Sequence, residues 1–268
     1  MKCYISYFKL KFITGLTYRS AALAGIATQF FFGFVYIMVY IAFFESPSSS
    51  TLPMQLPQLV TYIWLNQTFF ALINQFYKDN ELFDLVKTGN ISYELSRPKN
   101  IYFMWYFKIL GQRLAMVVLR CLPLLIVGLC LPNPYRLQLP LDMSHFIIFI
   151  LTLIVGSLLS TAVVTLYPII TLRTLNEKGI VNIIIVLADI LSGLVIPIPF
   201  FPDFLKTISN ILPFQYISDL PFRIYSGNIA LSVGLNGLKM QIIWLIILIV
   251  LGYIILKNSL KRVEVQGG

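Results

Sequence analysis

The chain has 268 residues, a formal net charge of +9, 58% hydrophobic residues and only 12% charged residues, about half the charged share of an ordinary soluble domain. This composition excludes a conventional soluble enzyme or nucleic-acid-binding domain, because too few polar residues remain to cover a water-exposed surface. The scattered cysteines Cys3, Cys121 and Cys130 have no CxxC spacing and lie near no histidine cluster, so neither a disulfide framework nor a metal site is expected.

Residues 1–19 are predicted to form an amphipathic helix that lies along the cytoplasmic membrane surface. Apolar residues recur there at helical spacing, and several lysines lie off that stripe. The alternative is a basic tail without fixed structure. The stripe consists of Ile5, Phe8, Phe12 and Leu16.

Six later segments are apolar enough to cross a bilayer, which takes about 20 residues of helix. Each must be helical, because a span in lipid has to satisfy its own backbone hydrogen bonds. We therefore expect an all-α membrane protein with six transmembrane helices in one domain, residues 1–268. The predicted spans are residues 20–44, 58–77, 102–131, 144–172, 180–199 and 238–256.

Lysines and arginines are distributed unevenly between the connections. Four lie before the first span and four between residues 78 and 101, whereas residues 45–57 have none. Because basic loops stay in the cytoplasm, both termini are expected there, with outside loops near 45–57, 132–143 and 200–237. The expected location is the bacterial plasma membrane, as a multi-pass protein.

The connection between the second and third spans is predicted to contain a short helix at residues 79–89. Asp79 or Asn80 can cap its start, where acidic residues suit the helix dipole, and Gly89 is a natural stop. The helix would present both charge and an apolar edge to the cytoplasm. Its candidate contact residues are Glu81, Leu82, Phe83, Asp84, Val86, Lys87 and Gly89.

The outer segment 200–227 is too apolar for a solvated loop. Prolines interrupt the chain at 197, 199 and 202, and two short helices are expected at 204–212 and 214–225. We expect this pair to re-enter the outer leaflet, shielded by protein.

Polar residues inside the predicted spans are candidate functional groups. Arg120 and Asp189 are intramembrane charges, which could pair only if their depths match, or could serve as packing anchors. Other polar side chains could line a route for an amphipathic substrate, and helix–helix hydrogen bonding explains them equally well. These candidates are Tyr36, Tyr40, Asn66, Gln67 and Asn74.

Residues 85–98, LVKTGNISYELSRP, resemble the cytoplasmic segment of ABC-2 type exporter permeases, and ILPFQY at 211–216 more weakly resembles their outer segment. The resemblance implies a permease without an ATPase domain that pairs with a second permease, identical or paralogous, above two separate ABC ATPase subunits. It also implies that residues 79–89 are a coupling helix, docking with the N-terminal helix on the ATPases. ATP and magnesium would then bind to the partner subunits and not to this chain.

The expected function is outward transport of a hydrophobic or amphipathic substrate such as a drug, peptide, lipid or glycolipid. The sequence contains no Walker A, GxSxG or HExxH motif, so no catalytic residue is assigned. Two alternatives stay open: an ion-coupled secondary transporter, and a membrane-embedded lipid-modifying enzyme. An enzyme of that kind would need clustered polar groups at one depth, and a secondary transporter would usually show inverted repeats.

Overall fold

A computed structural model describes residues 2–45, 52–95, 99–174 and 179–261 of the chain. The expected serine loop after residue 45, the Arg97-Pro98 pair and the basic residue Lys178 lie outside these ranges. Within them every regular element is a helix, which agrees with the predicted all-α class. The elements are α1 (Lys2–Leu16), α2 (Arg19–Phe44), α3 (Leu56–Ile73), α4 (Asn80–Lys87), α5 (Ile91–Leu95), α6 (Ile101–Cys130), α7 (Met143–Thr174), α8 (Ile180–Leu191), η2 (Ile198–Phe200), α9 (Asp203–Ile211), η3 (Phe214–Tyr216), α10 (Asp219–Tyr225) and α11 (Leu231–Leu260).

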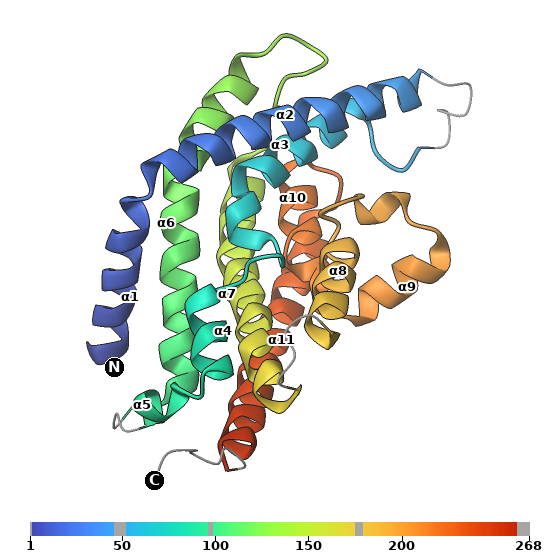
Figure 1. The fold of residues 1–268 in the computed structure, drawn as a ribbon. Helices are drawn as coiled ribbons and strands as arrows, with labels where there is room; N and C mark the ends of the chain where they lie inside the picture. Colours follow the sequence, from blue (N-terminus) through green and yellow to red (C-terminus); the bar gives the residue numbers. More distant parts are fainter. Residues whose placement is uncertain (1, 46–51, 96–98, 175–178, 262–268) are drawn as a thin grey trace.

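The helices α6, α7 and α11 form the long axis of the molecule (Figure 1). Helix α1 packs along the first half of α6, α11 packs along α7, and α2 crosses over α3 and α6. The start of α1, the end of α11 and the short helices α4 and α5 all lie at one end of the molecule, and the connection from α6 to α7 lies at the other.

Four described helices are long and apolar enough to cross a membrane: α2, α6, α7 and α11. They correspond to four of the six predicted spans. The other two predicted spans do not reach that standard, since α3 contains Asn66 and Gln67 near its middle and α8 has only 12 residues. The six-span count therefore stays a prediction.

Both of these helices end earlier than the sequence suggests. The hydropathy pattern extends α3 to residue 77, but the helix stops at Ile73, where the following carbonyl and amide groups bond to side chains of other helices. The same pattern extends α8 to residue 199, but the helix stops at Leu191, close to Gly193, whose φ of +81° favours glycine. Apolar residues continue past the ends of both helices, so the hydropathy pattern predicts longer helices than the structure contains.

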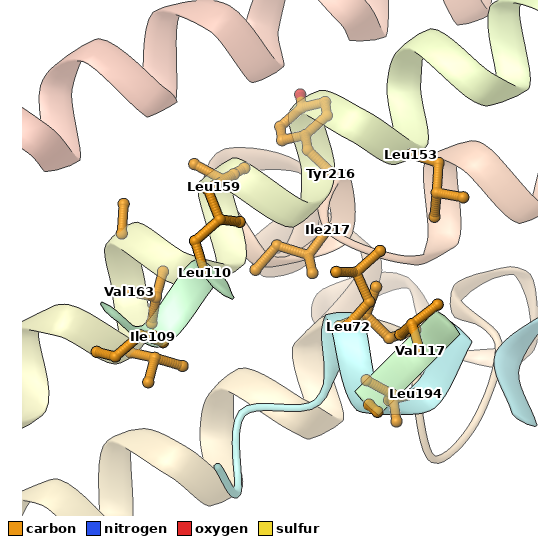
Figure 2. Packing of buried hydrophobic residues seen from close by; sticks show 14 of the residues in the cluster. Leu72, Ile109, Leu110, Val117, Leu153, Leu159, Val163, Leu194, Tyr216 and Ile217 are labelled. Carbon is orange, nitrogen blue, oxygen red and sulfur yellow. The ribbon is translucent and has the colours of Figure 1, made fainter. Parts of the chain in front are cut away.

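The core lies where α3, α6, α7 and the α10 region meet. Figure 2 shows its buried side chains, with Leu72 of α3 and Val117 of α6 close to Leu194, which follows α8, and with Ile217 near the middle. Inward-facing leucine, valine and isoleucine side chains from distant segments thus fix the short elements around α7.

Short helices occur where capping signals predict them. Asp79 precedes α4 and its carboxylate accepts the Leu82 N–H at 3.1 Å, while Gly89 follows with a φ of +73°. In the outer segment α9 agrees closely with the helix expected at 204–212, whereas the helix expected at 214–225 is divided into the short η3 and α10. The re-entrant position of this segment within a bilayer stays a prediction.

Helix α1 is the predicted N-terminal helix, but only part of its apolar stripe is covered by other helices. Phe8 and Phe12 lie against α6, where a Cβ atom added to Gly111 would come within 2.8 Å of the Phe8 carbonyl oxygen. Leu16 is half-buried, whereas Ile5 on the same stripe is 58% exposed. Because α1 runs beside a candidate span, its face is set by contact with α6, and its place at the membrane surface stays a prediction.

Candidate functional site

A cavity of about 260 Å³ lies between α2, α3 and the end of α8. Several polar side chains, among them Gln29, Asn66, Gln67 and Asp189, line it beside apolar neighbours such as Phe70. A partly open apolar cavity with a few convergent polar groups is the usual form of a small-molecule site. We call this cavity the polar pocket.

The polar pocket contains three of the five residues proposed for a translocation path. Tyr36, Asn66 and Gln67 line it, and Tyr40 lines a much narrower cavity beside it. Asn74 lies outside both cavities, because its side chain turns back to donate to the Phe70 carbonyl at 2.8 Å where α3 ends. The sequence places Gln67 and Asn74 on one helical face, and the early end of α3 separates them.

Several buried polar atoms in the pocket have no hydrogen-bond partner among the described residues. They are both side-chain polar atoms of Gln29, Oδ1 of Asn66 and Oδ2 of Asp189. Leaving such atoms unpaired is costly, and a bound water, ion or ligand is one way in which native proteins satisfy them. The pocket is therefore prepared for a polar partner.

Asp189 joins the pocket to the chain that leads into α4. While its Oδ2 atom is unpaired, its Oδ1 atom accepts the Gln75 N–H at 2.8 Å. Gln75 belongs to the segment 74–79, which connects α3 to α4 and which we call the α3–α4 linker. Asp189 therefore contacts both the pocket and this linker.

The α3–α4 linker is buried at its start, Asn74 and Gln75, where side chains of other helices bond to its backbone. Arg113 of α6 donates to the Leu72 carbonyl and, at 2.9 Å, to the Asn74 carbonyl. The Gln75 side chain donates to Ser160 of α7 at 2.7 Å. These bonds replace the helical ones that α3 lacks after Ile73, as buried irregular backbone requires.

Charged residues fasten α4 to α1 and α6. Lys108 of α6 forms ion pairs with Asp79 at 3.0 Å and with Glu81 at 2.7 Å, and Lys11 of α1 reaches Glu81 at 3.1 Å. The Lys108 side chain is only 1% exposed. Partial burial raises the pKa of Glu81, and the hydrogen bonds and charges of Lys108 and Lys11 outweigh that effect, so its pKa is lowered overall.

Helix α4 turns its apolar face inward and its charged face outward. Leu82, Phe83 and Val86 are buried in the core of this chain, which supports a packing role for them. Asp84 and Lys87 are exposed, together with Thr88 and Gly89 at the end of the helix. A partner that docks here would therefore meet charged side chains first, and the burial of Phe83 favours packing within this chain over the predicted contact with the ATPases.

The two charges singled out in the spans lie apart and do not pair. Arg120 donates to the Ala21 carbonyl at 3.3 Å, and its guanidinium covers Gly25 where α6 meets α2. Asp189 instead bonds the α3–α4 linker. The contacts of Arg120 are those of a packing anchor.

Sequence reasoning missed Gln29, Lys108 and Arg113. Both basic residues lie inside the predicted span 102–131, where buried charge signals function, although they follow closely on the basic loop before it. Gln29 is an amide side chain in the middle of the mainly apolar α2, a signal that is present in the sequence. Within the described ranges, no group of three potential metal ligands occurs.

A family model described as ABC-2 family transporter protein matches residues 30–267 of the chain. The match spans most of α2 and every later helix, including all residues of the polar pocket except Thr28 and Gln29. No curated protein and no solved structure gives a significant match.

Proposed function

The chain belongs to the ABC-2 family of transporter proteins, and we propose that it is the permease subunit of an ATP-driven exporter that moves an amphipathic substrate outward. Family membership makes it a membrane-embedded transport subunit that works with ABC ATPase subunits. The observation that supports the export of an amphipathic molecule is the polar pocket, since its lining combines apolar side chains with unpaired polar atoms. Such a lining suits a molecule with both kinds of surface.

The proposed complex contains two permease subunits, identical or paralogous, and two ATPases that carry ATP and magnesium. The ATPases would dock at the end of the molecule that holds α4. Support comes from the exposed charges Asp84 and Lys87, and from the ion pairs that tie α4 to α1 and α6. Through these pairs and the α3–α4 linker, a push on α4 would reach Asp189 in the pocket.

The proposed topology has six spans in a bacterial plasma membrane, with both termini in the cytoplasm. Besides the four long helices, α3 has 18 residues and at about 1.5 Å per residue nearly matches the hydrocarbon thickness. Helix α8 would cross together with the segment that follows it. The start of α1 and the end of α11 lie at the same end of the molecule in Figure 1, which supports placing both termini on one side of the membrane.

Cysteine labelling of intact cells tests this topology. The exposed residues Leu139 and Lys87 are each replaced by cysteine after the three native cysteines are changed to serine. A membrane-impermeant maleimide should label Leu139→Cys in intact cells and Lys87→Cys only after permeabilisation. The reverse pattern would overturn the assigned orientation.

Co-purification tests the proposed division of labour. The tagged chain should retain an ABC ATPase, identified by mass analysis, and the complex should hydrolyse ATP. The chain purified alone should show no turnover above the background of a mock preparation. Turnover by the isolated chain, or its persistent purification without an ATPase, would contradict the proposal.

A further inference from the structure

The unpaired atoms of the polar pocket specify the chemistry of its ligand more closely than the pocket's shape does. The Nδ2 atom of Asn66 donates to the Leu194 carbonyl at 2.8 Å, which fixes the amide so that its Oδ1 atom is left as an acceptor. The Oδ1 atom of Asp189 is occupied by the Gln75 N–H, so that its Oδ2 atom is also left as an acceptor. Both residues are at most 5% exposed. The pocket thus offers two fixed acceptors, beside the unpaired Gln29 amide, which can both accept and donate, and it suits a ligand with hydrogen-bond donors.

The charge of the pocket lining also favours a ligand that donates hydrogen bonds, in particular a cation. Asp189 is the charged residue of the lining, and no lysine, arginine or histidine of the described chain lines the cavity. The nearby Arg113 attracts Asp189 electrostatically, but it donates to the backbone carbonyls of Leu72 and Asn74 and forms no ion pair with the Asp189 carboxylate. A cation in the pocket would complete the pairing of a buried carboxylate, whereas an anion would be repelled.

Aromatic side chains make up much of the apolar lining. Phe32, Tyr36 and Phe70 border the cavity, and Phe32 and Phe76 are 44% and 60% exposed at its edge. Aromatic faces attract cations as well as apolar groups. A volume of about 260 Å³ holds a small ring or a head group, while a longer tail can extend past the exposed edge.

We propose that the polar pocket binds amphipathic molecules carrying a primary or secondary ammonium group, which donates to Asp189 Oδ2 and Asn66 Oδ1 while the apolar part lies against the aromatic side chains. The inference rests on the proposed transport function and names the substrate class. It separates simple cationic amines from phospholipids, including phosphatidylethanolamine, whose primary ammonium is joined to a phosphate that no basic residue of the described lining can receive.

Binding of a simple amine to the isolated chain tests the proposal. The protein is placed in phosphatidylcholine nanodiscs, and saturation-transfer NMR compares 4-phenylbutylamine with 4-phenylbutanol, with empty nanodiscs correcting for partition into lipid. We expect the amine to bind at least about tenfold more tightly than the alcohol, because a charge-assisted hydrogen bond is worth that much. Equal affinity for the two compounds would overturn the proposal.

Two variants assign the effect to the pocket. Asp189→Asn retains the acceptor for Gln75 and removes the charge, so amine affinity should fall about tenfold while alcohol binding is unchanged. Asp203→Asn removes the same charge from a fully exposed side chain and should leave both affinities unchanged. If Asp189→Asn does not fold, Asn66→Leu provides a second test, because it removes the other proposed acceptor, Oδ1, and should likewise weaken amine binding several-fold. Unchanged amine affinity in the folded pocket variant contradicts the proposal.

A lipid occupant is tested in the same nanodiscs. Replacing a third of the phosphatidylcholine with phosphatidylethanolamine should leave amine affinity unchanged, whereas competition would show that a lipid head group occupies the pocket and would overturn the assignment. The measurement needs no ATPase. Failure of amine binding in a chain that still retains its ATPase therefore rejects only this inference, and failure to retain an ATPase rejects only the proposed function.

Discussion

Replacing Lys108 with methionine is expected to destabilise the protein by about 3–5 kcal/mol, because it leaves the Asp79 carboxylate buried without a cation. The two side chains are 1% and 5% exposed and lie 3.0 Å apart. Methionine keeps much of the length of the lysine stem, so the loss reports the charge and not the packing. The change in the free energy of unfolding can be measured by titrating the detergent-solubilised protein with SDS.

A second substitution provides the control. The double variant Asp79→Asn, Lys108→Met removes the buried charge yet can still cap α4, since asparagine is as good a cap as aspartate. We expect the double variant to recover most of the lost stability, as Glu81 is 59% exposed and keeps Lys11 as a partner. A single Lys108→Met variant as stable as the unmodified protein would show that the pair contributes nothing.

Replacing Phe83 with alanine is expected to destabilise the chain by about 3–5 kcal/mol, the usual cost of removing a buried aromatic side chain. Phe83 is 2% exposed and belongs to the main core cluster. ATPase binding per folded molecule should then change little. Thermal stability and ATPase retention must be measured on the same preparation, because lower stability alone would lower the yield of complex.

The exposed side of α4 supplies the matched comparison. Asp84 is exposed, so Asp84→Ala should leave stability within about 0.5 kcal/mol of the unmodified protein. If α4 is the docking element, this variant should weaken ATPase retention, as the loss of an interface charge does. A Phe83→Ala variant with full stability and impaired docking would reverse these two roles.

The elements that the sequence predicts well are those whose determinants are local. The cap at Asp79 and the stop at Gly89 bound α4 closely, and four of the predicted apolar segments are the four candidate spans. The polar pocket is partly predicted through Asn66 and Asp189, because polar residues are conspicuous in an apolar segment. Such signals need no knowledge of distant contacts.

Long-range contacts determine what the sequence does not predict. Hydropathy does not indicate that α3 ends at Ile73, because the groups that bond the chain there come from Arg113, Ser160 and Asp189. The inward face of Phe83 is likewise set by packing of α4 against α7, while a short amphipathic helix by itself could turn that face to a partner. Capping signals and composition do not show whether the apolar face of α4 packs against its own chain or against a partner.

The early end of α3 has a consequence for the order in which the protein is made. The amide of Gln75 bonds to a carboxylate 114 positions later in the chain, and the Gln75 side chain bonds to Ser160, 85 positions later. While ribosomes are still translating α6, the backbone after Ile73 lacks these partners and has a high cost in lipid. If α3 crosses the bilayer as proposed, we expect it to reach its final depth only after α8 has been synthesised.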